Sequence, residues 1–208
     1  KYSQQDLAFA SYIPYYFKKW IEQIDTNVLP LVSKRIINNT CKILNFNYTD
    51  TLERAYKVPA ENILYIHGKA LSSKKLVVGH HDISTFQYGA VSPFNAAEEH
   101  GIYIQDDDED FRITETKEII KAYFQKTYKD TFGIIQMNQN FFDSLININE
   151  IFILGHSLSS VDMDYFVEIR KRVLHSCKWY ISYFSESDLD NMEYFAKRLD
   201  IKNFQPVM

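Results

Sequence analysis

Three short segments of the chain combine polar or titratable side chains with small residues, as active sites do. Asn47 follows an apolar run, and its carboxamide offers both a donor and an acceptor to a water or a ribose hydroxyl. His67 precedes Gly68, and a histidine with open space beside it can act as a general base. Structural alternatives remain open at this stage, namely an Asx turn or helix cap at Asn47 and an ordinary core or surface histidine at His67.

The third segment, residues 155–162, reads Gly-His-Ser-Leu-Ser-Ser-Val-Asp between an apolar run and a helical pattern. Free N–H groups and the dipole of a following helix suit such a turn to phosphate or ribose. The segment also approaches the G-x-S-x-G nucleophile elbow, with Ser159 in place of the last glycine. A hydrolase would need an acid and a histidine after Ser157, and the only downstream histidine is His175, within a helical pattern. A serine hydrolase using Ser157 therefore stays an alternative.

Short apolar runs precede these segments and predict the strands that position them. The expected strands are Lys42–Asn47, Asn62–His67, Lys75–Gly79, Glu150–Leu154 and Lys178–Phe184. The expected helices are Gln4–Asp25, Val28–Asn39, Glu115–Asp130, Ile134–Ile148, Asp162–His175 and one capped by Ser185 and Asp188 that runs through Leu199. This alternation predicts an α/β fold with a mostly parallel sheet flanked by helices, after an N-terminal helical segment. Because ligands bind at the carboxyl ends of parallel strands, we expect Asn47, His67 and Gly155 to converge at one edge.

Composition limits the classes of protein that the chain can represent. Its 208 residues fit one domain, with residues 1–40 as a helical segment and 41–208 as the sheet-containing core. A formal net charge of −4 gives no signal for nucleic-acid binding, and no apolar run is long enough for a membrane helix. Two cysteines do not make a disulfide framework or zinc site, and the acidic run Asp106–Asp110 lacks the pattern of a calcium loop. We expect no metal and a cytoplasmic location.

Taken together, the segments resemble a known family. Phe-Asn-Tyr-Thr-Asp-Thr-Leu-Glu at 46–53, Ile-His-Gly-Lys at 66–69, Gly-His at 79–80 and the stretch 153–166 resemble the bacteriophage abortive infection AbiH family. That family in turn is similar to sirtuin-like, Rossmann-like domains that act on NAD. The resemblance implies Asn47 as the catalytic asparagine and His67 as the catalytic base. It also implies nucleotide contacts from Gly68, Gly155, His156, Ser157 and Asp162.

The resemblance also implies an element that this chain does not show. The family opens with a strand and a Gly-Asn-Gly-Phe-Asp segment that forms a phosphate loop, and no such segment is present among the six glycines here. Doubly wound sheets place their first strand centrally. We therefore expect an apolar strand and a glycine-rich turn upstream of Lys1.

The function implied by the resemblance is phage defence through attack on the nicotinamide–ribose bond of NAD or a related nucleotide. The chain lacks the zinc-binding cysteines of deacylase sirtuins, which favours NAD hydrolysis over deacylation. An alternative is a nucleotide-sensing or partner-binding module without turnover. The expected partners are a nucleotide ligand and either further copies of the chain or a phage-derived trigger.

Overall fold

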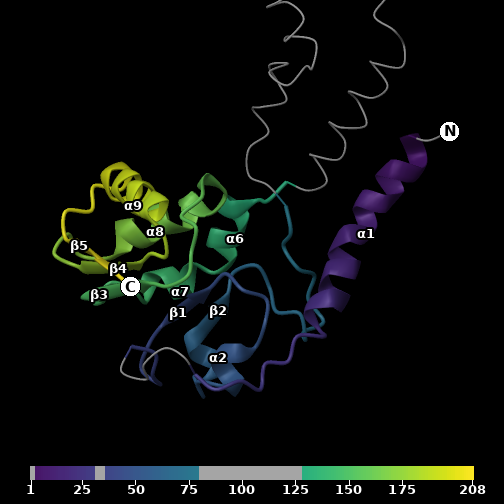
Figure 1. Ribbon diagram of the computed structural model, residues 1–208, viewed down its shortest axis with the longest axis horizontal. Coiled ribbons are helices and arrows are strands. Elements are labelled where there is room, and N and C mark those ends of the chain that lie inside the picture. Colours follow the sequence, from purple (N-terminus) through teal and green to yellow (C-terminus); the bar gives the residue numbers. More distant parts are fainter. Residues whose placement is uncertain (1–2, 31–35, 80–127) are drawn as a thin grey trace, which may run out of the picture.

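The computed structural model describes residues 3–30, 36–79 and 128–208, with side chains from Tyr12 onward (Figure 1). Several sequence predictions fall outside these ranges. They are the His80–His81 pair, the acidic run Asp106–Asp110 and most of the predicted helix Glu115–Asp130. The last residues of that predicted helix, 128–130, are described and are not helical.

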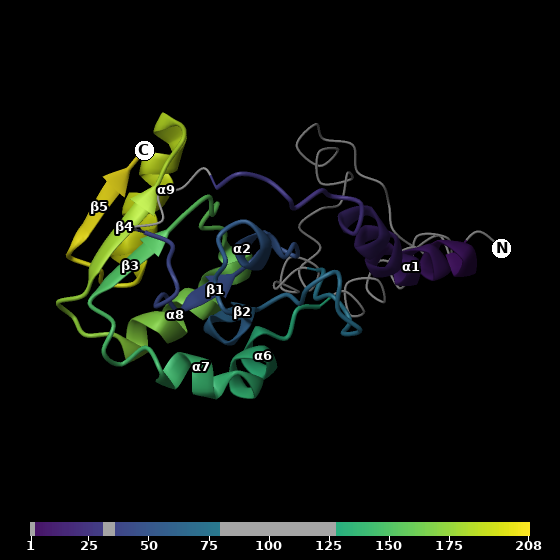
Figure 2. The ribbon, with the colours of Figure 1, turned by 90° about the horizontal axis from the view of Figure 1, so that it is seen from below.

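The chain begins with α1, Ser3–Ile21, which confirms the first predicted helix. Pro14 lies inside α1 and does not end it. The helix extends away from the strands (Figures 1 and 2), and Phe17 packs edge-on against Tyr48 with 5.0 Å between ring centroids. The predicted helix Val28–Asn39 is wrong where it is described, since 28–30 and 36–39 are not helical. Pro30 has no N–H to donate within a helix. Thr26, just before the start of the predicted helix, donates a buried hydrogen bond of 2.7 Å to Asp50.

The strands of the described residues form two parallel sheets rather than one. β1, Ile43–Asn45, pairs with β2, Ile63–Tyr65. β3, Glu150–Ile153, pairs with β4, Lys178–Ser182, which pairs with β5, Phe204–Val207. The α/β class and the parallel pairing are confirmed, and a single sheet is not.

The last strand and the sheet division bear on two expectations. β5 is not among the predicted strands. Its Pro206 is tolerated because, within the described ranges, β5 pairs with β4 alone, in the order β3-β4-β5. A continuous sheet built from the predicted strands would have contradicted the expectation of one further central strand. The two separate sheets leave that expectation standing as a prediction.

The predicted strand Lys75–Gly79 is wrong. These residues run past the end of β2 without joining a ladder. The Val77 N–H donates to the His67 carbonyl at 2.8 Å, and the Val77 carbonyl accepts from the Tyr48 hydroxyl at 2.8 Å. The backbone groups of Val77 are therefore satisfied by a loop residue and a side chain rather than by a neighbouring strand.

Helices cover one side of the three-stranded sheet (Figures 1 and 2). α8, Met163–Arg172, and α9, Glu186–Arg198, lie on this side, with α6, Thr131–Met137, and α7, Gln139–Asp143, against α8. The short helices are α2, Thr51–Arg54, and two 3₁₀ turns, η1, Ala60–Asn62, and η2, Ser160–Asp162. The predicted helix Ile134–Ile148 is two helices separated at Asn138, and the predicted start of α9 is confirmed, since the Asp188 carboxylate accepts from the Ser185 N–H at 2.9 Å.

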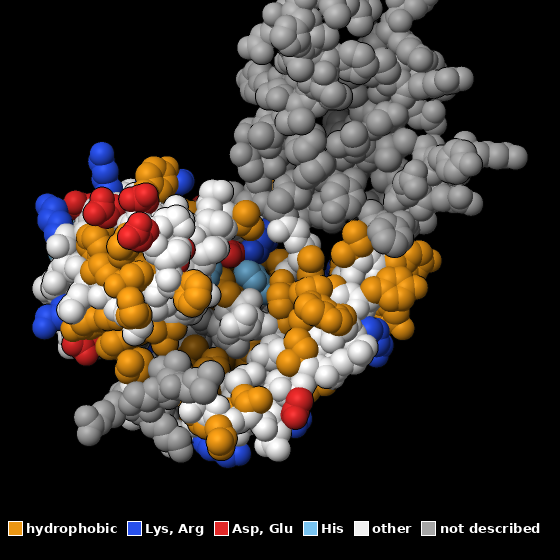
Figure 3. All heavy atoms as spheres, in the orientation of Figure 1, with side chains coloured by type: hydrophobic (Ala, Val, Ile, Leu, Met, Phe, Trp, Pro, Cys, Tyr) orange, Lys and Arg blue, Asp and Glu red, His pale blue; other side chains and the backbone are white. Residues whose placement is uncertain are grey.

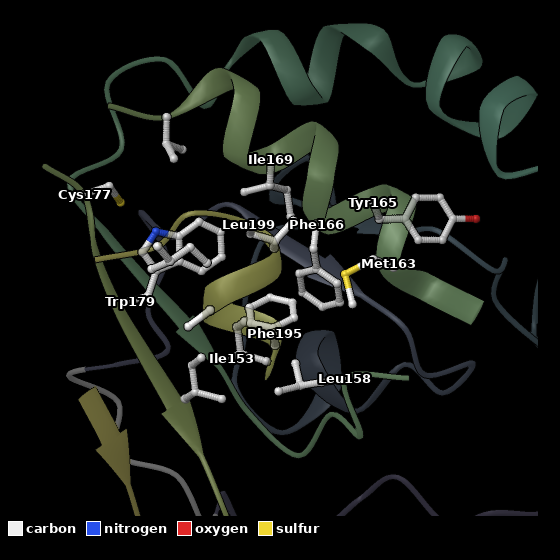
Figure 4. Packing of buried hydrophobic residues seen from close by; sticks show 14 of the residues in the cluster. Ile153, Leu158, Met163, Tyr165, Phe166, Ile169, Cys177, Trp179, Phe195 and Leu199 are labelled. Carbon is white, nitrogen blue, oxygen red and sulfur yellow. The ribbon is translucent and has the colours of Figure 1, made fainter. Parts of the chain in front are cut away.

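One hydrophobic core joins the two sheets. Its buried centre includes Phe166, Trp179 and Phe195 (Figure 4). Phe46, directly after β1, stacks on Phe166 of α8 with 5.5 Å between ring centroids and 17° between ring planes. This packing fixes the carboxyl end of β1 beside the helix that follows β3.

Candidate functional site

The segments that follow β1, β2 and β3 meet around the ring of Phe46. The Phe46 ring lies 5.6 Å from the ring of His67, after β2, and 4.5 Å from that of His156, after β3. Tyr48, on the other side of Asn47, has its ring 6.0 Å from that of His67. Polar side chains from three strand ends are thereby brought into one place.

Asp162, at the end of η2, is the centre of this group. Its Oδ1 lies 3.2 Å from Nε2 of His67 and accepts a hydrogen bond from Nζ of Lys129. Its Oδ2 lies 3.5 Å from Nε2 of His156. In Figure 3, histidine atoms lie near the centre of this face, next to acidic and basic side chains, where the surface is hollowed. One carboxylate thus links two imidazoles and an ammonium group.

Two polar atoms in this region are buried without a directed hydrogen bond. Nε2 of His67 is within 3.2 Å of Asp162 Oδ1, but the orientation falls short of a hydrogen bond, so this contact is mainly electrostatic. The hydroxyl of Tyr165 is the second such atom; it points away from the hydrophobic cluster in Figure 4, and the Tyr165 ring lies 5.9 Å from that of His67. Buried polar groups are nearly always satisfied, so these two neighbouring exceptions distinguish this region from the rest of the described interior.

Charge and burial act against each other at Asp162. Burial alone raises its pKa, but the contacts with the imidazoles of His156 and His67 and with the ammonium group of Lys129 hold the pKa of Asp162 well below its usual range. Burial lowers the pKa of Lys129, and Asp162 opposes that shift. Both pKa values are lowered. This favours the charged form of Asp162, which has three neighbouring donor groups, and disfavours the charged form of Lys129, whose burial Asp162 only partly offsets. Burial, aided by the Asp162 charge, raises the pKa of Tyr48 to about 12.

These shifts predict a loss of stability in acid. A carboxyl group whose pKa is lowered by folding stabilises the protein fully above its unfolded pKa, and this contribution is lost as the pH falls through the folded value. We expect the free energy of unfolding to decrease as the pH falls below about 4, near the pKa of an unperturbed Asp. Urea unfolding at pH 7 and pH 3 measures this. In the variant Asp162→Asn the difference between the two pH values should be smaller, and an unchanged difference would contradict the role of Asp162.

The turn after β3 is held in an unusual backbone conformation. Gly155 has φ +63°, and Leu158 has φ +55°, which is uncommon for a residue with a side chain. The Leu158 N–H donates to Nδ1 of His156 at 2.9 Å, so Nδ1 carries no proton and the ring proton lies on Nε2, facing Asp162. The Gly155 N–H donates to the Ser182 hydroxyl at 2.8 Å. His156 therefore joins the turn to the carboxylate.

This geometry separates two roles of His156. The variant His156→Asn can retain an acceptor for the Leu158 N–H, as in an Asx turn, while losing the contact with Asp162. His156→Ala loses both. We expect His156→Ala to be destabilised by about 1 kcal/mol more than His156→Asn, the usual contribution of one hydrogen bond. Urea unfolding of both variants tests this, and equal stability would show that the Leu158 hydrogen bond contributes nothing.

Asn47 lies at the rim of the group. Its side chain is exposed, and its backbone N–H donates to Oδ1 of the buried Asn45 at 3.0 Å. The Asx turn at this position is therefore made by Asn45, and the residue that precedes α2 is Asp50. Asn45 makes the turn and Asp50 precedes the helix, so neither structural alternative applies to Asn47 itself.

The remaining predicted residues differ in their surroundings. Gly68 does not face open space, because a Cβ there would lie 3.2 Å from the Lys75 carbonyl oxygen. Gly155 faces open space, since a Cβ there would meet no atom within 4 Å. Ser157 is exposed, and no hydrogen bond joins it to a base within the described ranges. His175, which a serine hydrolase would need, is instead bonded to Arg170.

No group of three or more His, Cys, Asp or Glu residues in the described ranges has the arrangement of a metal centre. At Asp162 the ammonium group of Lys129 occupies the carboxylate oxygen nearest His67.

Sequence reasoning missed the contribution of Lys129, Tyr48 and Tyr165. Lys129 is buried, which is rare for a lysine. Its partner Asp162 is 33 residues away, so no local spacing indicates the pair. Tyr165 could have been found, because it lies three residues after Asp162, at the separation that places side chains on one helix face.

The fold and the site define an α/β protein in which polar side chains gather at the carboxyl ends of parallel strands. The chain belongs to the bacteriophage abortive infection AbiH family, whose model matches residues 3–183. This membership supports a role in abortive-infection defence against phage. Neither a curated protein nor a solved structure matches the chain significantly.

Within the described ranges, no helix combines the length and apolar character that crossing a membrane requires.

Proposed function

We propose that this protein defends bacteria against phage by hydrolysing the nicotinamide–ribose bond of NAD or a related nucleotide in the cytoplasm. The observation that carries the proposal is the buried imidazole of His67, whose Nε2 lies beside the Asp162 carboxylate without a directed hydrogen bond. A histidine next to a largely enclosed carboxylate can accept a proton, because the carboxylate stabilises the imidazolium that forms.

The proposed reaction uses residues from the ends of β1 and β2. The bond between ribose C1′ and the nicotinamide nitrogen breaks, and its electron pair stays with the leaving nicotinamide. A water, oriented by the exposed carboxamide of Asn47, forms the new bond to C1′ and gives a proton to His67. The products are nicotinamide and ADP-ribose.

The turn after β3 is the proposed nucleotide-binding element. Open space beside Gly155 lets a ligand approach the backbone closely, and the exposed hydroxyls of Ser157 and Ser159 can bond ribose or phosphate oxygens. The turn is fixed by the hydrogen bond from the Leu158 N–H to His156 and by the contact of His156 with Asp162. Gly68 acts by packing the loop after His67 rather than by leaving room for a ligand.

The test is incubation of the purified protein with NAD, followed by chromatography of the products. Release of nicotinamide with ADP-ribose supports the proposal. A rise in melting temperature with NAD but no product would support a nucleotide-sensing module instead. Labelling by a fluorophosphonate that is lost in Ser157→Ala would support a serine hydrolase. Neither product nor thermal shift with NAD would contradict the proposal.

A further inference from the structure

Lys129 is unusual among the charged residues of this protein because it is only 4% exposed. It lies two residues before α6 and hydrogen-bonds Oδ1 of Asp162. Its Nζ also lies 5.5 Å from the centroid of the Tyr165 ring, on α8. Lysines are almost never fully buried unless they are paired, so this one is held in the interior by Asp162 and by the aromatic face.

We infer that Lys129 is a positioning residue that keeps Asp162 ionised and fixes its two oxygens between His67 and His156. Lys129 and His67 share Oδ1, which leaves Oδ2 for His156. The hydrogen bond from Lys129 places a positive charge against Oδ1, and a neighbouring positive charge favours the ionised form of a carboxylate. The inference deepens the proposed function, in which Asp162 assists His67, and it names the residue that sets the charge of that pair.

The other charged groups near Asp162 cannot replace Lys129. Asp130, at the start of α6, and Asp164, on α8, carry the same sign as Asp162. Tyr48 and Tyr165 are neutral at physiological pH, because burial raises the pKa of both hydroxyls. Within the described ranges, Lys129 is the only lysine or arginine that forms an ion pair with Asp162. Without it, a largely enclosed carboxylate would be left facing two imidazoles, and protonation of the carboxylate would become easier.

The test is the titration of the Asp162 carboxyl carbon by ¹³C NMR in protein labelled at aspartate. In Lys129→Met, which keeps the length of the side chain and removes its charge, we expect the Asp162 midpoint to rise by about one pH unit or more. In Lys129→Arg, which keeps the charge, the midpoint should stay near that of the unchanged protein. Lys171→Met removes an exposed lysine of α8 and should leave the midpoint unchanged. An Asp162 midpoint that does not move in Lys129→Met would overturn the inference.

A second variant covers the case in which Lys129→Met does not fold. Lys129→Met combined with Asp162→Asn removes both charges and leaves no unpaired one, so the double variant should fold. If Lys129 acts only through Asp162, the double variant and the single variant Asp162→Asn should share the same ¹⁵N ring shifts of His67 and His156. The ring shifts of both variants should differ from those of the unchanged protein, in which the Lys129–Asp162 ion pair is intact. Ring shifts that follow Lys129 regardless of Asp162 would contradict the inference. Neither measurement requires NAD, so their outcome is separate from that of the turnover assay.

Discussion

Replacing His67 with alanine is expected to reduce nicotinamide release by about 10²–10⁴-fold, the usual contribution of a general base. The imidazole is 6% exposed and lies 3.2 Å from Asp162, so no solvent base can take its place without rearrangement. Rates of nicotinamide release under saturating NAD measure the effect.

Two controls distinguish a base from a structural histidine. His175→Ala removes an imidazole that is paired with Arg170 outside the site and should leave the rate unchanged. His67→Gln keeps a polar side chain of similar reach, so it should fold while remaining as slow as His67→Ala. If His67→Gln restores most of the rate, the imidazole is not the base.

Replacing Asp162 with alanine is expected to produce the largest loss of stability, about 3–5 kcal/mol, because it leaves the buried ammonium group of Lys129 without a partner. The contact with Nε2 of His67 is lost at the same time. The midpoint and slope of urea unfolding at pH 7 give the free energy.

The matched control is Asp190→Ala on the exposed side of α9, which should change the free energy of unfolding by no more than about 0.5 kcal/mol. Removing both charges, with Lys129→Met and Asp162→Asn together, should restore much of what Asp162→Ala loses. A loss below about 1 kcal/mol in Asp162→Ala would mean that the ion pair is not a stabilising element of the fold.

The segments around the strand ends could be predicted from the sequence because each is a local pattern, although β1 and β2 end two residues earlier than predicted, at Asn45 and Tyr65. An apolar run followed by polar and small residues marks His67 and Gly68 after β2, and Gly155 and His156 after β3. Because β2 and β3 belong to different sheets, the rule for parallel strands does not by itself bring these ends together, and the packing of Phe46 on Phe166 does. The same reasoning fails for Lys75–Gly79, whose apolar residues serve a loop that is bonded to His67 and Tyr48.

What could not be predicted depends on contacts between distant residues. The pairing of Lys129 with Asp162 and the packing of Phe46 against His156 each join parts of the chain that no period or motif connects. The division of the strands into two sheets is likewise a property of pairing and not of any single strand. β5 is not among the predicted strands, and its Pro206 is compatible with a strand because β5 pairs with β4 at the edge of the described sheet.

In the proposed function, the segments after β1, β2 and β3 form one nucleotide site. Titration of NAD into ¹⁵N-labelled protein, followed by NMR, tests this claim directly. We expect amide shifts at Asn47, Gly68, Gly155 and Ser157 that saturate together with one dissociation constant, and no shift at Gln205 on β5. Shifts at these four amides that saturate at different concentrations, or shifts confined to other parts of the protein, would contradict a shared site.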